Sequence, residues 1–264
     1  MIKNITLGQY FPGDSVMHRM DPRMKFLLTL ALIVLIFCVR TVYGYAAVVA
    51  VLLLAILLSR ISVKYVLKGI KPLWFILVFT FILNIFFITE GKVLLEWWIF
   101  RITEGGLIKA VNIAVRLVLL VSITTVLTLT TSPMEITDAL ERLLKPLTVL
   151  HFPAHEMALM MSIALRFIPT LVDETDRIMK AQTARGASFD SGGLIKRAKG
   201  MVPILVPLFV SAFKRADELA LAMESRCYHG GKNRTRMKVM HMSFRDFVAL
   251  GIVAGVTVFI CFGF

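Results

Sequence analysis

The chain has 264 residues, of which 58% are hydrophobic, and it carries a formal net charge of +13. Soluble domains are about 45–50% apolar. Here the excess lies in long runs, which indicates an integral membrane protein. In a soluble protein so basic a composition suggests nucleic-acid binding, but the basic residues lie in segments expected in the cytoplasm, where Lys and Arg accumulate in membrane proteins. We therefore expect a lipid bilayer around the chain and no nucleic-acid partner.

Five apolar runs are expected to cross the bilayer as helices, so the predicted fold is an all-α integral membrane protein with a cytoplasmic domain of amphipathic helices. An N-terminal cytoplasmic segment, residues 1–25, precedes them. It ends in a helix start at which Asp21 can cap the helix and Pro22 takes the first position. Four spans fall within 26–130 and the fifth follows the cytoplasmic domain. The predicted spans are 26–39, 45–58, 72–89, 107–129 and 244–264.

The orientation follows from a loop at residues 60–71 that contains basic residues and no acidic one. The positive-inside rule places this loop, and with it the N-terminus, in the cytoplasm, and leaves the C-terminus outside. Residues 90–106 are then an outer loop, in which Trp97 and Trp98 favour the membrane interface. Arg116 lies inside the fourth span, so its side chain should face protein or water.

Residues 131–243 are expected to form one cytoplasmic block of three helices. The first helix, 135–144, begins with a capping box in which Ser132 and Glu135 bind each other's backbone N–H groups, and Pro133 takes the first position.

The second and third cytoplasmic helices share one layout. The second, 154–185, has an apolar half followed by a charged half, and Pro169 between them should bend it. The third begins with an apolar stretch, 201–213, and continues through a charged stretch to Arg226. One half of each helix therefore lies against or in the membrane, and the other half projects from it.

Two arginines that close these helices, Arg185 and Arg226, are the most informative residues of the chain. Either one alone is explained by the favourable interaction of a cation with a helix C-terminus, and Gly186 is a natural residue after a helix end. The pair, on matched helices facing the cytoplasm, favours binding to a partner, because Arg offers a planar fork of donors to carboxylates and carbonyls.

Motifs for catalysis are missing from the sequence. Gly192-Gly193 and Gly230-Gly231 lack the spacing of a phosphate-binding loop, and His155-Glu156 lacks the second histidine of a zinc-protease motif. The acidic run 173–176 stands alone, so we interpret it as a solvated helix face. We therefore expect neither an enzyme nor a bound metal.

Three stretches of the chain carry a family resemblance. They are Gly8-Gln9-Tyr10 with residues 18–25, Thr131-Ser132-Pro133-Met134-Glu135, and the two arginine motifs Ala184-Arg185-Gly186 and Ser225-Arg226-Cys227. Together they span nearly the whole chain. The chain resembles the transmembrane T components (EcfT, CbiQ-like) of energy-coupling factor (ECF) transporters, which import vitamins and metals and are driven by ABC-type ATPases.

In that family, motifs of the Ala-Arg-Gly type end two crossed coupling helices, and each docks into a groove of one ATPase subunit. The resemblance thus implies two ABC-type ATPase partners, which bind the ATP, and no cofactor in this chain. The first motif matches fully. The second keeps only its arginine, which leaves its backbone geometry open. The implied docking residues are Ala184, Arg185, Gly186, Ser225, Arg226 and Cys227.

The resemblance also implies a substrate-binding membrane S component, and thus uptake of vitamins or other micronutrients across a bacterial cell membrane. The Met-rich apolar face of the second cytoplasmic helix is expected to contact it, because Met surfaces accept varied partners. Ordinary helix packing explains any single Met equally well. The expected contact residues are Met157, Met160, Met161, Ala164 and Phe167.

The alternative is a self-contained membrane channel or carrier with a cytoplasmic regulatory domain. It predicts polar groups for the substrate inside the spans, and activity without partners.

Overall fold

The computed structural model describes residues 10–39, 41–88, 92–97, 100–150, 152–187, 189, 193–230 and 240–262. Gly8, Gln9, Trp98 and the last two residues of the fifth predicted span lie outside these residues. The chain separates into two compact units. The membrane unit comprises Gly8–Ala139 and Met240–Phe264. The other, consisting chiefly of Leu140–Val239, is named the α7–α8 unit after its two long helices, Ala154–Ala184 (α7) and Leu194–Glu224 (α8).

The membrane unit is helical apart from one short antiparallel hairpin among its described residues. This confirms the predicted all-α class. Its elements are α1 (Pro22–Cys38), α2 (Val42–Ser59), α3 (Val63–Ile70), the 3-10 turn η1 (Lys71–Leu73), α4 (Trp74–Phe87), β1 (Val93–Trp97), β2 (Phe100–Thr103), α5 (Glu104–Thr130) and α9 (Phe244–Phe262); α6 (Pro133–Leu144) leads out of it.

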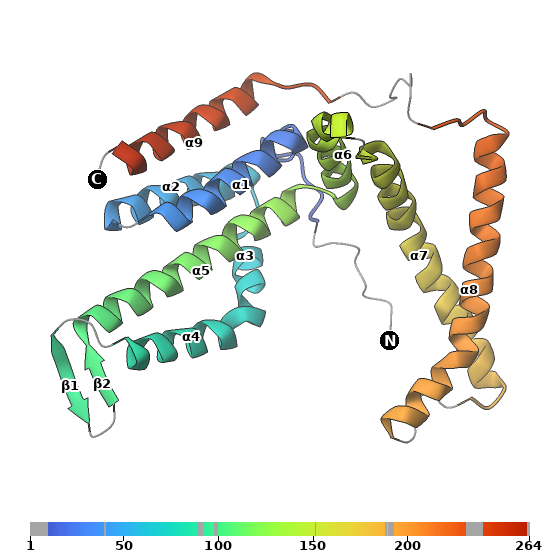
Figure 1. The fold of residues 1–264 in the computed structure, drawn as a ribbon, viewed down its shortest axis with the longest axis horizontal. Coiled ribbons are helices and arrows are strands. Elements are labelled where there is room, and N and C mark those ends of the chain that lie inside the picture. Colours follow the sequence, from blue (N-terminus) through green and yellow to red (C-terminus); the bar gives the residue numbers. More distant parts are fainter. Residues whose placement is uncertain are drawn as a thin grey trace. The chain divides into compact units, whose positions relative to one another are not determined.

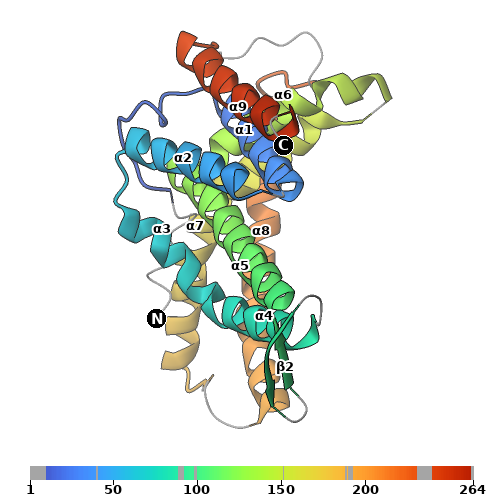
Figure 2. The ribbon, with the colours of Figure 1, turned by 90° about the vertical axis from the view of Figure 1, so that its left-hand side faces the viewer.

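Helix α5 is the centre of the membrane unit, and α1, α2, α3 and α4 all pack against it. Helix α9 packs on α1 and α2, on the side away from α4 (Figures 1 and 2). The core is aliphatic: Ile36 and Val48 are fully buried, and Leu119 and Ile123 of α5 join them. The outward faces are apolar too, with Phe87 80% exposed. Such faces suit a surrounding of lipid.

Five helical segments of the described chain are long and apolar enough to cross a membrane. Four of them contain or overlap the second to fifth predicted spans. The first predicted span lies on α1, whose 17 residues are at the lower end of the roughly 17–25 that cross a bilayer. The remaining segment is α7, whose first half is apolar. The five are Val42–Ser59, Val63–Phe87, Glu104–Thr130, Ala154–Ala184 and Phe244–Phe262.

The basic segment 60–71 is mainly helical, so the prediction of a loop there is wrong. It forms α3 and runs through η1 into α4. Val66 of α3 is buried, whereas Lys64 and Lys68 are exposed. The apolar residues recur at helical spacing, and this signal was available in the sequence. Of the basic residues on which the orientation rests, Lys64, Lys68 and Lys71 lie at the beginning of the Val63–Phe87 segment, ahead of α4.

Arg116 faces protein, in line with the prediction. Its guanidinium donates to the Val39 carbonyl and the Tyr45 hydroxyl, both at 3.3 Å, and lies 5.6 Å from the ring centroid of Phe37. Both the end of α1 and the beginning of α2 are thereby attached to α5. An arginine at membrane depth is tolerated where such partners exist.

The α7–α8 unit contains the end of α6, a 3-10 segment η2 (Lys145–Leu150), α7 and α8. Helix α7 matches the predicted 154–185 closely and contains Pro169. Helix α8 begins at Leu194, earlier than the apolar stretch from which the third helix was predicted, and contains Pro203 and Pro207.

The orientation in the membrane is tested by cysteine labelling in intact cells. We expect a cysteine at Glu104 to react with an impermeant maleimide, and a cysteine at Lys64 to react only after permeabilisation, because the basic α3 should be cytoplasmic. Both positions are exposed. The natural free cysteines Cys38, Cys227 and Cys261 are exposed and must first be replaced by Ser. The opposite labelling pattern would invert the topology.

Candidate coupling surface

The first arginine tip closes α7 with a Schellman turn. Arg185 is the C-cap residue, and Gly186 follows it with a φ of 88°, in the left-handed region. The Gly186 N–H donates to the Thr183 carbonyl (2.9 Å), and the Ala187 N–H donates to the Gln182 carbonyl (3.0 Å). These are the two hydrogen bonds of the Schellman motif, in which the residue after the cap is left-handed. Glycine adopts this conformation without a clash at Cβ.

The second tip repeats this turn at the end of α8 without a glycine. The Cys227 N–H donates to the Glu224 carbonyl (2.9 Å), and the Tyr228 N–H donates to the Met223 carbonyl (3.0 Å). Counted from Arg226, these bonds join the same positions as the two bonds of the first tip counted from Arg185. Cys227 has a φ of 56°, a conformation that costs a residue with a Cβ about 1–2 kcal/mol. The replacement of Gly by Cys therefore preserves the backbone of the second tip.

All six predicted docking residues are exposed. Within the described part of the chain, neither Arg185 nor Arg226 makes a side-chain hydrogen bond or an ion pair. Each guanidinium can therefore give its full set of donors to an acceptor on another protein. The structure brings the two tips to the same local geometry, and it leaves both accessible.

Helices α7 and α8 pack against each other in antiparallel directions (Figure 1). The Gln182 side chain near the end of α7 donates to the Pro203 carbonyl in the first third of α8 (3.4 Å), and Arg215 of α8 pairs with Glu174 of α7 at 3.5 Å. From Pro203 the helix continues to Glu224, over roughly 30 Å at about 1.5 Å per residue. The two tips therefore lie at opposite ends of the helix pair.

The predicted Met-rich face of α7 exists as a surface. Its residues recur at helical spacing, and Met160 is the most exposed of the three methionines at 60%. Phe167 is half-buried, and the other members are exposed. No feature of the structure tests what this face contacts. The face consists of Met157, Met160, Met161, Ala164 and Phe167.

Helix α8 carries a longer exposed apolar stripe that sequence reasoning did not single out. Its members stand at spacings of one, three and four residues, which places them on one side of the helix. Phe213 is 68% exposed. The 3.6-residue period of this stretch was a sufficient signal, but the stretch was treated only as the apolar half of a helix. The stripe consists of Met201, Val202, Leu205, Val206, Phe209, Val210 and Phe213.

The second tip is connected to the beginning of α7 and the end of α6. The hydroxyl of Tyr228, in the Schellman turn, lies 3.5 Å from Nε2 of His155. Nδ1 of the same histidine lies 2.9 Å from a carboxylate oxygen of Glu141 on α6. Glu141 and the capping box lie on the same helix, α6. Side-chain contacts thus join the second tip to the end of α6.

A buried polar junction fastens the beginning of α1 to the beginning of α9. Asp246, only 1% exposed, accepts hydrogen bonds from the Asp21 N–H (3.1 Å) and the Ser243 N–H (2.7 Å). Asp21 is buried and accepts from the Arg23 guanidinium (2.7 Å), as well as capping α1 as predicted. Arg23 also donates to the Met240 carbonyl (3.4 Å). The chain that returns from the α7–α8 unit is therefore held at its first residues.

The same junction fastens α1 to the end of α5. Buried Lys25 donates from Nζ to the Thr130 carbonyl (3.0 Å) and the Thr131 hydroxyl (3.4 Å). The predicted capping box follows at once and is confirmed: the Ser132 N–H donates to the Glu135 carboxylate (3.1 Å), and the Glu135 N–H donates to the Ser132 hydroxyl (3.3 Å). The connections to the α7–α8 unit through α6 and through Met240 thus begin beside the buried junction, which comprises Asp21, Arg23, Lys25, Thr130, Thr131 and Asp246.

Tyr10, from the first stretch of the family resemblance, lies beside this junction. Burial, then the charges of Glu135 and Asp14, raise the pKa of its hydroxyl above the ordinary value of 10.0. The backbone N–H of the next residue, Phe11, donates to the Leu129 carbonyl at the end of α5 (3.0 Å). The N-terminal segment is therefore bound to the end of α5 beside the junction. The hydroxyl of Tyr10 stays in its neutral form.

These residues can form hydrogen bonds and apolar contacts, and they can transmit displacement between helices. Among the described residues, no group of His, Cys, Asp and Glu side chains is arranged to hold a metal ion.

Comparisons with known proteins show the family of the chain. The family model described as "Cobalt transport protein" (CbiQ) matches residues 13–237. The energy-coupling factor transporter transmembrane protein EcfT of Clostridium kluyveri is 55% identical over 251 residues, which are 94% of this chain and 93% of that protein. EcfT of Thermosediminibacter oceani is 52% identical over 256 residues (96% of each chain), and EcfT of Bacillus subtilis is 46% identical over 263 residues (98% of this chain and 99% of that protein). The similarity therefore covers both units.

Removing the glycine of the first Schellman turn and introducing one into the second should have opposite effects on amide hydrogen exchange. In Gly186→Ala, a Cβ meets no atom within 4 Å, so the change imposes only the left-handed strain of about 1–2 kcal/mol. We expect amide exchange at Ala187 to accelerate roughly 5- to 30-fold, and Cys227→Gly to slow exchange at Tyr228 by a similar factor. Hydrogen–deuterium exchange of the two tip peptides measures both.

Gly193→Ala is the matched control, because that glycine also has open space at Cβ but a φ of −69°. It should leave exchange at both tips unchanged. Equal effects of Gly186→Ala and Gly193→Ala would contradict the assigned turn.

Proposed function

The chain belongs to the CbiQ/EcfT family of transporter transmembrane proteins, and from that premise we propose that it is the coupling subunit of an ECF-type ABC importer. In this proposal, two ABC-type ATPase subunits hydrolyse ATP, and a membrane S component binds a vitamin or another micronutrient. The present chain transmits the motion of the ATPases to the S component and performs no catalysis. The observation that carries the proposal is the pair of exposed arginine tips with matching backbone geometry.

Docking of one ATPase at each tip is supported by geometry and by chemistry. The tips have the same backbone hydrogen bonds, so two similar grooves can accept them. They lie at opposite ends of the α7–α8 pair, so two separate proteins can each bind one tip. Arg185 and Arg226 have no side-chain partner within the described residues, and a guanidinium suits carboxylates and carbonyls of a groove.

Contact with the S component is supported by two apolar surfaces in the α7–α8 unit. The Met-rich face of α7 was expected from the sequence, and the α8 stripe adds a larger one. Exposed apolar patches of this kind mark protein or membrane contacts, and methionine side chains adapt to partners of different shape. A coupling subunit that serves several S components needs such an adaptable surface.

Transmission into the membrane unit is supported by the connections from the tips to the junction. The Tyr228–His155–Glu141 contacts lead from the second tip to α6. Helix α6 begins after Ser132, directly next to the buried junction. The chain that returns from the α7–α8 unit reaches the junction at Met240. Movement of the α7–α8 unit therefore acts on α1, α5 and α9 together. The proposed orientation, with the N-terminus in the cytoplasm, places the tips on the side where ATP is available.

Removing either guanidinium should weaken coupling. For Arg185→Ala or Arg226→Ala in the reconstituted complex, we expect ATPase affinity to fall about 30-fold or more, because truncating one partner of a buried charged hydrogen bond costs about 2–5 kcal/mol. The double variant should abolish assembly, and Lys at either position should restore it only in part, since an ammonium lacks the planar fork. Co-purification and ATP-dependent uptake into vesicles measure these effects.

Arg177→Ala is the matched control, an exposed arginine on α7 away from the tip. It should retain assembly and uptake. Normal assembly and uptake by the double variant would show that the arginines serve only to cap their helices.

A variant with a weakened junction should still hydrolyse ATP but should transport poorly. Asp246→Ala leaves the Asp21 and Ser243 N–H groups without their acceptor, at about 1–3 kcal/mol for each buried group. We expect the reconstituted complex to bind both ATPases and hydrolyse ATP while uptake drops severely. The control is Thr257→Val on the same helix, whose hydroxyl donates to the Val253 carbonyl one turn earlier and has no other hydrogen bond to the described residues. Loss of hydrolysis and uptake in equal proportion would mean that Asp246 supports only the fold.

A further inference from the structure

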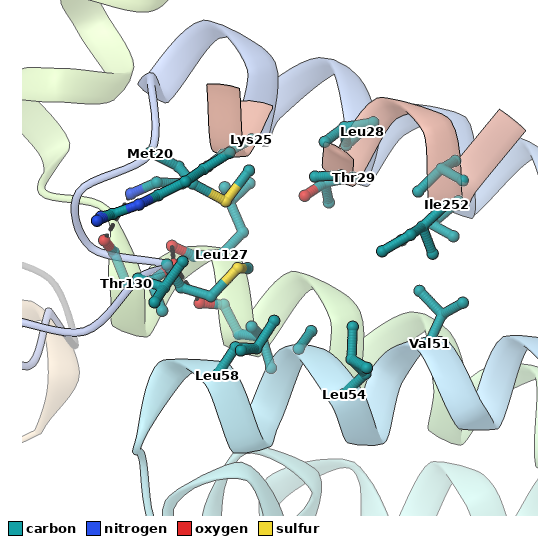
Figure 3. A pocket seen from close by; sticks show the side chains of 18 of the residues that line it. Met20, Lys25, Leu28, Thr29, Val51, Leu54, Leu58, Leu127, Thr130 and Ile252 are labelled. Atoms are coloured by element: carbon teal, nitrogen blue, oxygen red, sulfur yellow. Dashed lines mark hydrogen bonds between the residues drawn. The ribbon is translucent and has the colours of Figure 1, made fainter. Parts of the chain in front are cut away.

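The membrane unit contains an apolar groove of about 400 Å³ between α1, α2, α5 and α9. Leu28 and Thr29 line it on the α1 side, and Leu54 and Leu58 line it on the α2 side (Figure 3). Val51 lies at the end of the groove away from Lys25. None of these residues belongs to the arginine tips or to the apolar faces of the α7–α8 unit. The groove is therefore a separate feature of the part of the chain that lies in the bilayer.

One end of the groove carries basic side chains. Lys25 lies at this end together with Met20 and Thr130 (Figure 3), and Arg245 at the beginning of α9 also lines the groove. Buried Lys25 donates to oxygens of the chain and lies near the carboxylates of Glu135, Asp246 and Asp21, which offset its charge. The Arg245 side chain is exposed, so its guanidinium is the cation that an anion in the groove can reach.

We propose that this groove binds one anionic phospholipid. An acyl chain lies along the apolar walls, and the phosphate meets the exposed guanidinium of Arg245. Basic pockets between spanning helices recognise lipid headgroups in this way. The lips of the groove are exposed, with Leu58 at 41% and Val248 at 45%, so a lipid can enter sideways from the bilayer.

The volume favours a lipid chain over a protein helix. A helix with its side chains is about 10–12 Å wide and rises about 5.4 Å per turn, so that one turn occupies roughly 400–600 Å³. The groove holds less than a spanning helix needs, whereas pockets for flexible small ligands are about 300–1,000 Å³. A lipid in this place packs against both α1 and α9, so it stabilises the same pair of helices that the buried junction joins.

Native mass spectrometry of the full chain tests the proposal. The solubilised protein is titrated with phosphatidylglycerol and with phosphatidylcholine that carries identical acyl chains. We expect one tightly held lipid with a preference for phosphatidylglycerol. Ala55→Trp, which fills the groove from α2, should remove it. Arg245→Gln should lower the preference about fivefold while a lipid is still bound, since one basic residue near a headgroup contributes about 1 kcal/mol.

Two matched variants serve as controls: Ala46→Trp on an exposed position of α2 outside the groove, and Lys64→Gln on exposed α3. Both should bind lipid as the natural chain does. Leu127→Trp fills the groove from α5 and replaces Ala55→Trp if that variant melts at a lower temperature. Unchanged lipid number and preference in the filled variants would overturn the proposal. A second copy of the chain or another protein crosslinked to a cysteine at Ala55 would overturn it as well.

Discussion

The carboxylate of Asp246 holds together helices that are far apart in the sequence. It binds the backbone N–H of Asp21 across 225 positions of the chain, together with that of Ser243. A buried carboxylate is stable only when its oxygens have such donors. With Lys25 bound to the end of α5, three helices meet at one place. The chain passes from this junction into α6, and it returns from the α7–α8 unit through Met240 beside it.

The distribution of polar and apolar surface explains why the α7–α8 unit suits mechanical coupling. Each long helix joins an apolar surface to an exposed arginine turn, and the two helices are fixed to each other at Gln182 and Arg215. A tip that moves carries its apolar face with it. The Schellman turns make the tips rigid, because the backbone around each arginine is held by two hydrogen bonds. At Cys227 this geometry is kept despite its conformational cost, so the turn is retained where a glycine is not available.

Local chemistry in the sequence was sufficient for much of this structure. The cap at Asp21 and the capping box at Ser132 depend on residues within three positions of each other, and both were predicted correctly. The end of α7 before Gly186 follows from local chemistry in the same way, whereas docking at the two tips stays a prediction. The segment 60–71 was taken as a loop because its charge was weighed and its helical period was not. The partner of Asp246 could not be predicted, since no local pattern specifies a hydrogen bond across nearly the whole chain. The left-handed Cys227 runs against local preference, and the family resemblance implied a second tip there but left its backbone geometry open.

If the chain couples as proposed, ATPase motion rotates or shifts the α7–α8 unit as one body against the membrane unit. Distances between pairs of spin labels in the reconstituted complex measure this motion, and Lys64 of the membrane unit, Lys180 of α7 and Lys214 of α8 are exposed positions for the labels. We expect ATP to change the distance between labels at Lys64 and Lys180 and to leave the distance between Lys180 and Lys214 constant. A constant distance for the first pair, or a change confined to the second, would contradict it.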